Sequence, residues 1–321
     1  MKTLRQNLPL VATAAIFCAL FGAAAFFYEG FFSARVVTSL LADNAFLGIA
    51  AVGMTLVIFS GGIDLSVGAV IGFTSIFTAT LVTGRGVPPE VAWALALLLG
   101  TGLGALMGTL IQVFRLPPFL ITLAGMFLAR GAGFWLNTES VGIRHPLYDR
   151  LANFDLALGD AVHLPAAALG LIGVVAAGYV VAHHTRFGRT LLAVGGSEQS
   201  ALLMGLPVGP TKIAVYALNG FCAAVAGIVA TLYTGSGNPS MGIGLELDAI
   251  AVVVIGGTLL AGGRGHVLGT LLGVLIFGTI QAAILFDGRL SSWWMRIVVG
   301  GLLLGFILLQ RFFIRGAARR G

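Results

Sequence analysis

The stretch NAFLGIAAVGMTLVIFSGGIDLSVGAVIGFTSIFTATLVTG, residues 44–84, decides the class of fold. Nearly every residue in it is apolar or small, and Asp64 carries its only charged side chain. A membrane-spanning helix needs about 20 mostly apolar residues, so this run is too long for one crossing and too short for three. We therefore expect it to turn at Gly61 and Gly62, the only adjacent pair of helix breakers within it.

The whole chain has the composition of an integral membrane protein. Of its 321 residues, 58% are hydrophobic and 9% are charged, and the mean hydropathy is +1.02. A soluble domain would carry roughly 25% charged residues. The 47 glycines suit helices that pack closely in lipid. We expect an all-α, polytopic transmembrane helical bundle, with residues 1–321 forming a single domain.

Breaks at polar, charged or Gly/Pro positions divide the chain into about ten candidate spans, with eight to ten as the expected range. They are 8–28, 44–61, 65–83, 90–113, 117–137, 164–184, 213–233, 247–262, 266–286 and 291–310. The apolar part of the first span, about 20 residues, exceeds a signal-peptide core, so we interpret it as a retained anchor.

The basic residues predict the orientation of the bundle. With the N-terminus inside, eleven lie at inner ends: Lys2, Arg5, Arg115, Arg186, Arg189, Lys212, Arg264, Arg311, Arg315, Arg319 and Arg320. Five lie at outer ends: Arg35, Arg85, Arg144, Arg150 and Arg289. This excess predicts that both termini are cytoplasmic. Arg130 and Arg296 fall near the outer ends of spans, where long side chains can snorkel to the interface.

Two segments of the chain resemble each other. SGGIDLSVGAVIG and AGGRGHVLGTLLG share four glycines at an offset of 201 residues, and the same offset pairs Ile49-Ala50 with Ile250-Ala251. Internal repeats are common in transporters. Because the chain is so rich in glycine, the match indicates either a duplication or chance.

The chain lacks the motifs of an enzyme. We find no phosphate-binding loop, HExxH, GxSxG or Cys/His cluster, and the cysteines, Cys18 and Cys222, are isolated. We therefore expect no catalysis, no metal and no cofactor in this chain.

Asp64 and the pair Glu246 and Asp248 are acids inside apolar segments, where a charge is costly without a partner. We expect Asp64 to N-cap the helix that follows it, and Glu246 and Asp248 to lie in the first turn of the eighth span.

The longest predicted inner loop, residues 185–212, has internal structure of its own. Gly195 and Gly196 break the chain, Ser197 can N-cap and Glu198 falls in the first turn of a short helix. Gly205 can end that helix and Pro207 prevents its continuation. We expect Ala201, Leu202 and Met204 to form one apolar contact surface, either for a docking partner or against the membrane.

Several motifs, in order along nearly the whole chain, resemble a known family. SGGIDLSVG, LITLAGMFLARG, RFGRTLLAVGGSEQSALLMG, ELDAIAVVVIGGTLLAGGRGHVLGTLLG and SSWW are similar to the membrane (permease) subunits of ribose/xylose/arabinose-type ABC sugar importers. DNAFLGIAAVGMT, HPLYDRL and SSWW are most similar to the galactofuranose-type permease subunits.

The resemblance implies a bacterial inner-membrane importer with several partners. These are a cytoplasmic ATP-binding subunit, a second permease subunit (identical or different) and a periplasmic sugar-binding protein. By the same resemblance, the loop from Gly195 to Gly205 is the coupling helix, and Asp64, Glu246 and Asp248 lie along the translocation path or brace it.

We place four further polar residues nearest the sugar, Asn44, Asn219, Ser236 and Asn238, although each could instead make an interhelical hydrogen bond. The alternative function is an autonomous ion-coupled carrier that uses Asp64 or Asp248.

Overall fold

The computed structural model describes residues 8–157, 162–289 and 293–318. Lys2, Arg5, Arg319 and Arg320, which contributed to the predicted orientation, lie outside this range. The first part of the chain forms α2 (Leu8–Phe27), α3 (Ala34–Asp43), α4 (Ala45–Phe59), α5 (Val67–Ala79), the π-helical turn η1 (Thr80–Gly84), α6 (Pro89–Val113), α7 (Pro118–Leu136), β1 (Val141–Gly142), α8 (Pro146–Ala152) and β2 (Asp155–Ala157). The second part forms β3 (His163–Pro165), α9 (Ala166–Tyr179), the π-helical turn η2 (Val180–His184), α10 (Arg186–Gly196), α11 (Glu198–Leu203), α12 (Val208–Thr234), β4 (Ser236–Gly237), α13 (Leu245–Ile255), α14 (Val267–Asp287) and α15 (Trp293–Ala318).

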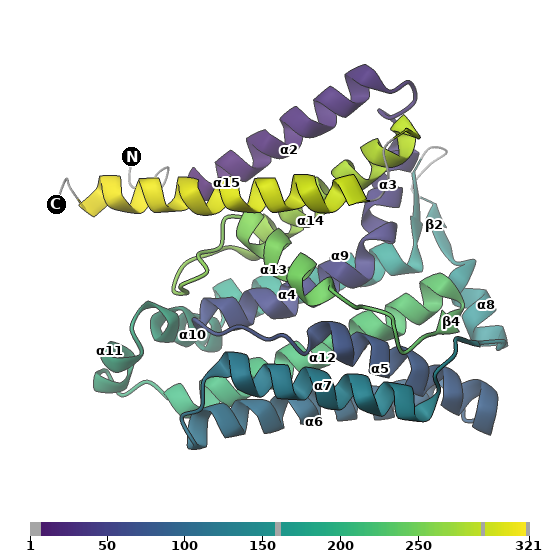
Figure 1. The fold of residues 1–321 in the computed structure, drawn as a ribbon, viewed down its shortest axis with the longest axis horizontal. Coiled ribbons are helices and arrows are strands. Elements are labelled where there is room, and N and C mark those ends of the chain that lie inside the picture. Colours follow the sequence, from purple (N-terminus) through teal and green to yellow (C-terminus); the bar gives the residue numbers. More distant parts are fainter. Residues whose placement is uncertain (1–7, 158–161, 290–292, 319–321) are drawn as a thin grey trace.

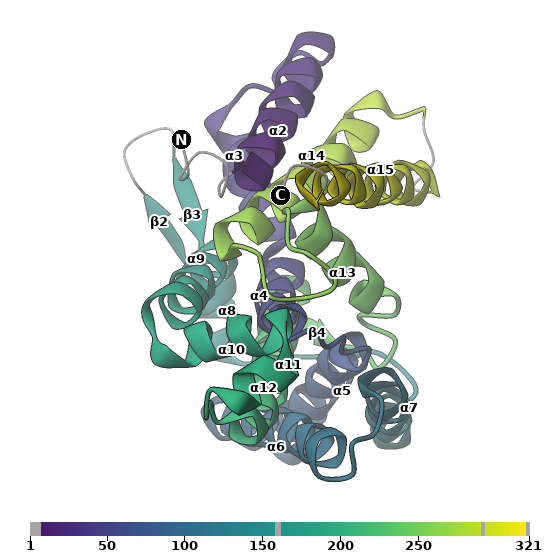
Figure 2. The same cartoon turned by 90° about the vertical axis from the view of Figure 1, so that its left-hand side faces the viewer.

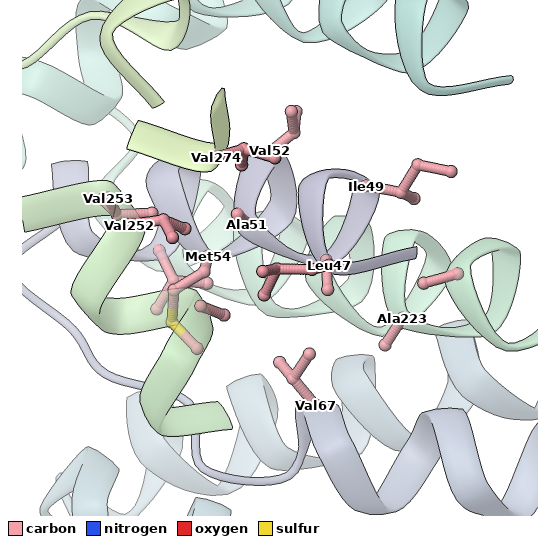
Figure 3. Packing of buried hydrophobic residues seen from close by; sticks show 14 of the residues in the cluster. Leu47, Ile49, Ala51, Val52, Met54, Val67, Ala223, Val252, Val253 and Val274 are labelled. Carbon is pink, nitrogen blue, oxygen red and sulfur yellow. The ribbon is translucent and has the colours of Figure 1, made fainter. Parts of the chain in front are cut away.

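Helix α4 lies at the centre of the bundle. Fourteen of its 15 residues are buried, and its neighbours are α9, α10, α12, α13 and α14. Figure 3 shows Leu47 and Met54 of α4 among buried side chains of α5, α12, α13 and α14. Seen from the α11 end, α5, α6, α7 and α12 lie on one side of α4 and α2, α14 and α15 on the other (Figure 2).

The expectation of an all-α, polytopic membrane protein is confirmed, but the count of ten spans is not reached. In the described residues, seven helices are long and apolar enough to cross a membrane, and an eighth is formed if α3 and α4 count as one span bent by 59°. The bend lies at Asn44, whose side-chain amide donates to the Leu40 carbonyl oxygen at 3.0 Å.

The predicted span 247–262 is shorter than a membrane crossing. Helix α13 has only 11 residues, because the left-handed conformations of Gly244 before it and Gly257 after it (φ +83° and +87°) exclude a longer helix. Helix α15 begins at Trp293 and has 26 residues, so it covers the part of the predicted span 291–310 that the structure describes. For residues 247–262, the apolar run therefore predicted a buried helix correctly but not its length.

The two similar segments form similar backbone units. The first unit is α4, a break over residues 60–66, and α5 with η1; the second is α13, a break over residues 256–266, and α14. In each unit the first helix runs toward the end of the bundle that carries α10 and α11, and the second runs back (Figure 1).

The opposite end of the bundle carries the short strands and α8 (Figure 1). Strand β1 pairs antiparallel with β4, and β2 pairs antiparallel with β3. Trp93 of α6 donates its indole N–H to the Tyr148 hydroxyl at 2.9 Å, and that hydroxyl lies 3.1 Å from the Thr231 hydroxyl. Burial raises the pKa of Tyr148 above its usual value. These contacts hold α8 against α6 and α12.

Candidate translocation and coupling sites

Asp64 lies in the break between α4 and α5 and is completely buried. Its Oδ1 accepts from the Ser66 backbone N–H at 2.8 Å and from the Ser66 hydroxyl at 2.6 Å, and its Oδ2 accepts from the Asn219 amide at 2.8 Å. Three donors aimed at one carboxylate compensate a buried anion in part. No salt bridge of the described residues includes Asp64.

The prediction that Asp64 N-caps the next helix is wrong in detail. Helix α5 begins at Val67 and Ser66 occupies the N-cap position. Asp64 instead bonds the backbone two residues ahead of itself, which is an Asx turn that orders the segment before the helix. The sequence indicated the acceptor role but not the position of the helix start.

The partner of Asp64 lies on α12, where Tyr216 and Asn219 are three residues apart and share a helix face. Both are buried, and the Tyr216 hydroxyl and Asn219 Oδ1 have no hydrogen-bond partner among the described protein groups. The hydroxyl faces Gly62 and Oδ1 faces Gly53, so each lies against a glycine of the first unit. Asn219 was predicted as a path residue; Tyr216 was missed, although a tyrosine one turn before a buried asparagine could have suggested it.

A second polar group surrounds the extended segment that precedes α13. Arg130 of α7 donates from Nη1 to the Pro239 carbonyl oxygen at 2.7 Å and to the Met241 carbonyl oxygen at 2.8 Å. Instead of snorkelling outward as predicted, the side chain turns inward because Gly72 leaves room for it: a Cβ at Gly72 would lie 2.6 Å from Nη1. Arg130 therefore fastens residues 239–241 to α5 and α7.

The first turn of α13 contains Glu246 and Asp248, as predicted. Glu246 interacts electrostatically with Arg130, and its Oε2 lies against Gly68 of α5. Asp248 interacts electrostatically with Arg296 of α15, whose guanidinium also lies 5.6 Å from the Trp293 ring centroid. Each acid thus has a basic neighbour, and the second group joins α5, α7, α13 and α15.

The other predicted path residues have local structural partners. The Asn238 backbone N–H and carbonyl both bond the Ser75 hydroxyl, and its side chain accepts from the Ser240 N–H at 2.8 Å. Ser236 pairs with Gly142 between β4 and β1. Asn44 stabilises the α3–α4 bend. The predicted residues thus fall into one group around Asp64 and Asn219, a second from Ser236 to Asp248, and Asn44 apart from both.

Helix α11 has the caps that the sequence predicted. The Ser197 hydroxyl accepts from the Ser200 N–H at 3.2 Å, and Gly205 has φ +73°. The Leu206 N–H bonds the Ala201 carbonyl and the Gly205 N–H bonds the Leu202 carbonyl, which is a Schellman motif. Glu198 pairs with Lys212 of α12 at 2.6 Å. This six-residue helix is therefore held at both ends.

The apolar side chains of α11 divide between two faces. Ala201 is completely buried against Val194, Leu206 and Val208. Leu202, Leu203 and Met204 are 56%, 84% and 66% exposed. Ala201, Leu202 and Met204 therefore do not form the predicted single surface, because Ala201 is covered by side chains of α10 and α12 while Leu202 and Met204 are exposed. Ala201 anchors the helix, and the other three side chains form an exposed apolar tip, hereafter the α11 tip.

Comparison with known proteins identifies relatives over most of the chain. Residues 36–307 match the family described as branched-chain amino acid transport system / permease component. Similar proteins are the inner membrane ABC transporter permease protein YjfF of Escherichia coli (49% identical, covering 96% of this chain and 93% of the relative), the fructose import permease protein FruG of Bifidobacterium longum (39%, 96% and 92%) and the ribose import permease protein RbsC of E. coli (39%, 87% and 87%). No solved structure matches significantly.

These relatives bear out the expectation that the chain is a transport component and not an enzyme. They are permease subunits of ABC systems, in which the ATPase activity lies in a separate subunit.

Proposed function

We propose that this chain, which belongs to the branched-chain amino acid transport system / permease component family, is the membrane-spanning permease subunit of an ATP-driven importer for a monosaccharide. The sugar class is supported by its similarity to relatives named as fructose and ribose import permeases. Galactofuranose, or a related pentose or hexose, is the substrate we favour from the motifs quoted above. The competing ion-coupled carrier is not favoured by these relatives.

The observation that carries the coupling mechanism is the exposed α11 tip on a helix with both ends capped. Three adjacent apolar side chains in water are costly unless a partner covers them. We assign that partner as the cytoplasmic ATP-binding subunit and the segment 185–212 as the coupling loop, so the α11 end of the bundle is the cytoplasmic end. The ends of the described chain, at α2 and α15, lie on the same side as α11 (Figure 1), which supports two cytoplasmic termini.

The partner subunit would supply ATP binding and hydrolysis, so this chain needs no cofactor of its own. A neutral sugar gains nothing from the membrane potential, and import against a gradient must therefore draw on another energy source. Alternating access requires two conformations that ATP and the sugar bind with different affinity. A periplasmic sugar-binding protein and a second permease subunit complete the proposed importer.

We further propose that the α4–α5 and α13–α14 units descend from a duplication. Support comes from the matching helix bounds: adding 201 to the start of α4 gives 246, where α13 starts at 245, and adding 201 to the start of α5 gives 268, where α14 starts at 267. The polar groups at Asp64 with Asn219, and at Arg130 with Glu246, are the parts of these units that we place nearest the sugar path.

The test is sugar uptake and ATP hydrolysis by the importer reconstituted in proteoliposomes. Leu203→Asp places a charge on the α11 tip and should reduce co-purification of the ATP-binding subunit and sugar uptake at least tenfold. Gln199→Asp adds the same charge to the same helix outside the tip and serves as the matched control. Normal uptake by Leu203→Asp would refute the docking role, and uptake that requires an ion gradient but no ATP would refute the function.

A further inference from the structure

Three non-adjacent segments meet beside the start of α11. They are the end of α4 with the first residues of its break (59–62), the end of α10 (195–196) and the break after α13 (261–263). The Gly263 N–H donates to the Phe59 carbonyl oxygen at 3.0 Å, which joins the two breaks directly. We call the meeting point of Gly61, Gly195, Gly262 and Gly263 the glycine junction.

The segments touch through their backbones. A Cβ at Gly195 would overlap the Phe59 carbonyl oxygen and lie 2.6 Å from the Gly263 nitrogen. A Cβ at Gly262 would lie 2.6 Å from the Gly61 nitrogen and 3.2 Å from the Gly195 Cα. Because the atoms in the way belong to the backbone, no side-chain rotation could relieve these overlaps.

The junction also depends on left-handed backbone at Gly61 and Gly262, with φ +78° and +87°. Residues with side chains rarely adopt this region. The conformation turns each break back toward the bundle at the point where α10 reaches it.

Each segment of the junction leads to a different functional part. Gly195 is two residues before Ser197, the N-cap of α11. Gly61 leads to Asp64, and Gly263 leads to the start of α14. The close-packed glycines between α6 and α12, in contrast, join two continuous helices and lead to no break.

We infer that the glycine junction is a positioning element for transport, through which displacement of α11 moves the breaks of both units together. This inference rests on the proposed function, because it requires that a partner displaces α11. A contact between backbones transmits displacement directly, since closely packed groups have no free space to absorb it. One small helix would then control the segment that holds Asp64 and the segment that begins α14.

The test compares two glycines that differ in their surroundings. Gly195→Ala places a methyl group inside the junction, whereas a Cβ at Gly173 on α9, outside the coupling loop, has nothing within 4 Å. In the complete importer in proteoliposomes, Gly195→Ala should retain the ATP-binding subunit and ATP hydrolysis but lose sugar uptake at least tenfold. Gly173→Ala should match the unmodified importer in both activities. Normal uptake by Gly195→Ala would overturn the inference and leave the proposed function intact.

A second measurement decides the case if Gly195→Ala fails to assemble. Cys18 and Cys222 are replaced by serine, and cysteines are introduced at Gly196 and Arg264, which flank the junction and have exposed positions. A short thiol-reactive cross-linker that attaches to both cysteines through disulfide bonds should then abolish uptake while ATP hydrolysis continues. Reduction of those disulfides should release the linker and restore uptake. Full uptake by the cross-linked importer would overturn the inference. Absence of ATP-driven uptake by the unmodified importer would instead overturn the proposed function.

Discussion

The α4–α5 unit and the α13–α14 unit share a backbone plan but differ in what their breaks contain. Both turn at a glycine in the left-handed conformation, Gly61 in one and Gly262 in the other. The first break then places Asp64 in a buried site. The position 201 residues later is Gly265, which lies against Phe59 and Thr258.

The difference shows that the turn itself does not require a carboxylate. Glycine conformation accounts for the reversal in both units, whereas only the first unit maintains an acid bonded to Ser66 and Asn219. A buried charge that is not needed for the backbone path is a functional candidate in a membrane protein. The two units also differ in the segments that precede them: α3 precedes α4, whereas an extended segment held by Arg130 precedes α13.

The largest expected effect comes from removing the acid of the first break. Asp64→Leu leaves the N–H and hydroxyl of Ser66 and the amide of Asn219 without their acceptor, at about 1–3 kcal/mol for each orphaned donor. We expect a loss of about 3–9 kcal/mol in the free energy of unfolding, measured by denaturation in detergent.

Asp64→Asn is the matched control, since it keeps an oxygen acceptor for Ser66 and should cost less than Asp64→Leu. Equal loss of uptake in both variants would indicate that transport requires the charge, which would revive the ion-coupled alternative.

The next largest effect is expected for the segment that precedes the second unit, residues 239–241. Arg130→Gln loses two charge-assisted hydrogen bonds to residues 239–241 and leaves Glu246 without its basic neighbour. Hydrogen bonds to charged groups contribute about 1.5–3 kcal/mol each, so we expect a loss of about 3–6 kcal/mol in the free energy of unfolding and faster proteolysis at residues 239–241. Arg150→Gln, at an exposed position, should leave both unchanged. Equal proteolysis in the two variants would contradict the fastening role.

A smaller effect tests the position in the second break that corresponds to Asp64. Gly265→Ala adds a methyl group against the Phe59 ring and 2.6 Å from the Thr258 hydroxyl oxygen. Overpacking of this kind lowers the free energy of unfolding by about 1–3 kcal/mol. Gly173→Ala on α9 is the control, because a Cβ there meets nothing within 4 Å. A stable Gly265→Ala protein would show that the second break adapts more easily than its packing indicates.

The smallest effect concerns pH. His266 N-caps α14 by accepting the Leu268 N–H at Nδ1, and burial lowers its pKa below 6.5. The folded state thus favours the neutral ring, so the unfolded state binds more protons and stability falls as the pH drops below about 6.5. His266→Asn retains an N-cap acceptor without titrating. The thermal unfolding temperature, measured at a series of pH values from about 7.5 to about 5.5, should fall less steeply with pH for the variant than for the unmodified protein. An equally steep fall in both would refute the assignment to His266.

Features that depend on local chemistry could be predicted from the sequence. The hydroxyl of Ser197 and the backbone freedom of Gly205 define the two ends of α11 within nine residues, and both assignments are confirmed. The bond between Asp64 and Asn219 spans 155 residues, and nothing in either segment identifies the other. The length of α13 was also hidden, because apolar residues continue past Ile255 while glycine conformation ends the helix. Solvent exposure of Leu202 and burial of Ala201 required the position of α12, which periodicity over six residues cannot supply.

The α11 tip has a consequence for how cells make this protein. A copy inserted into the membrane before its partner arrives presents Leu202, Leu203 and Met204 to water, and such surfaces invite aggregation and recognition by chaperones and proteases. Cellular abundance of the chain should therefore follow that of the subunit that covers the tip. Production of the chain alone would give low yields that co-expression restores.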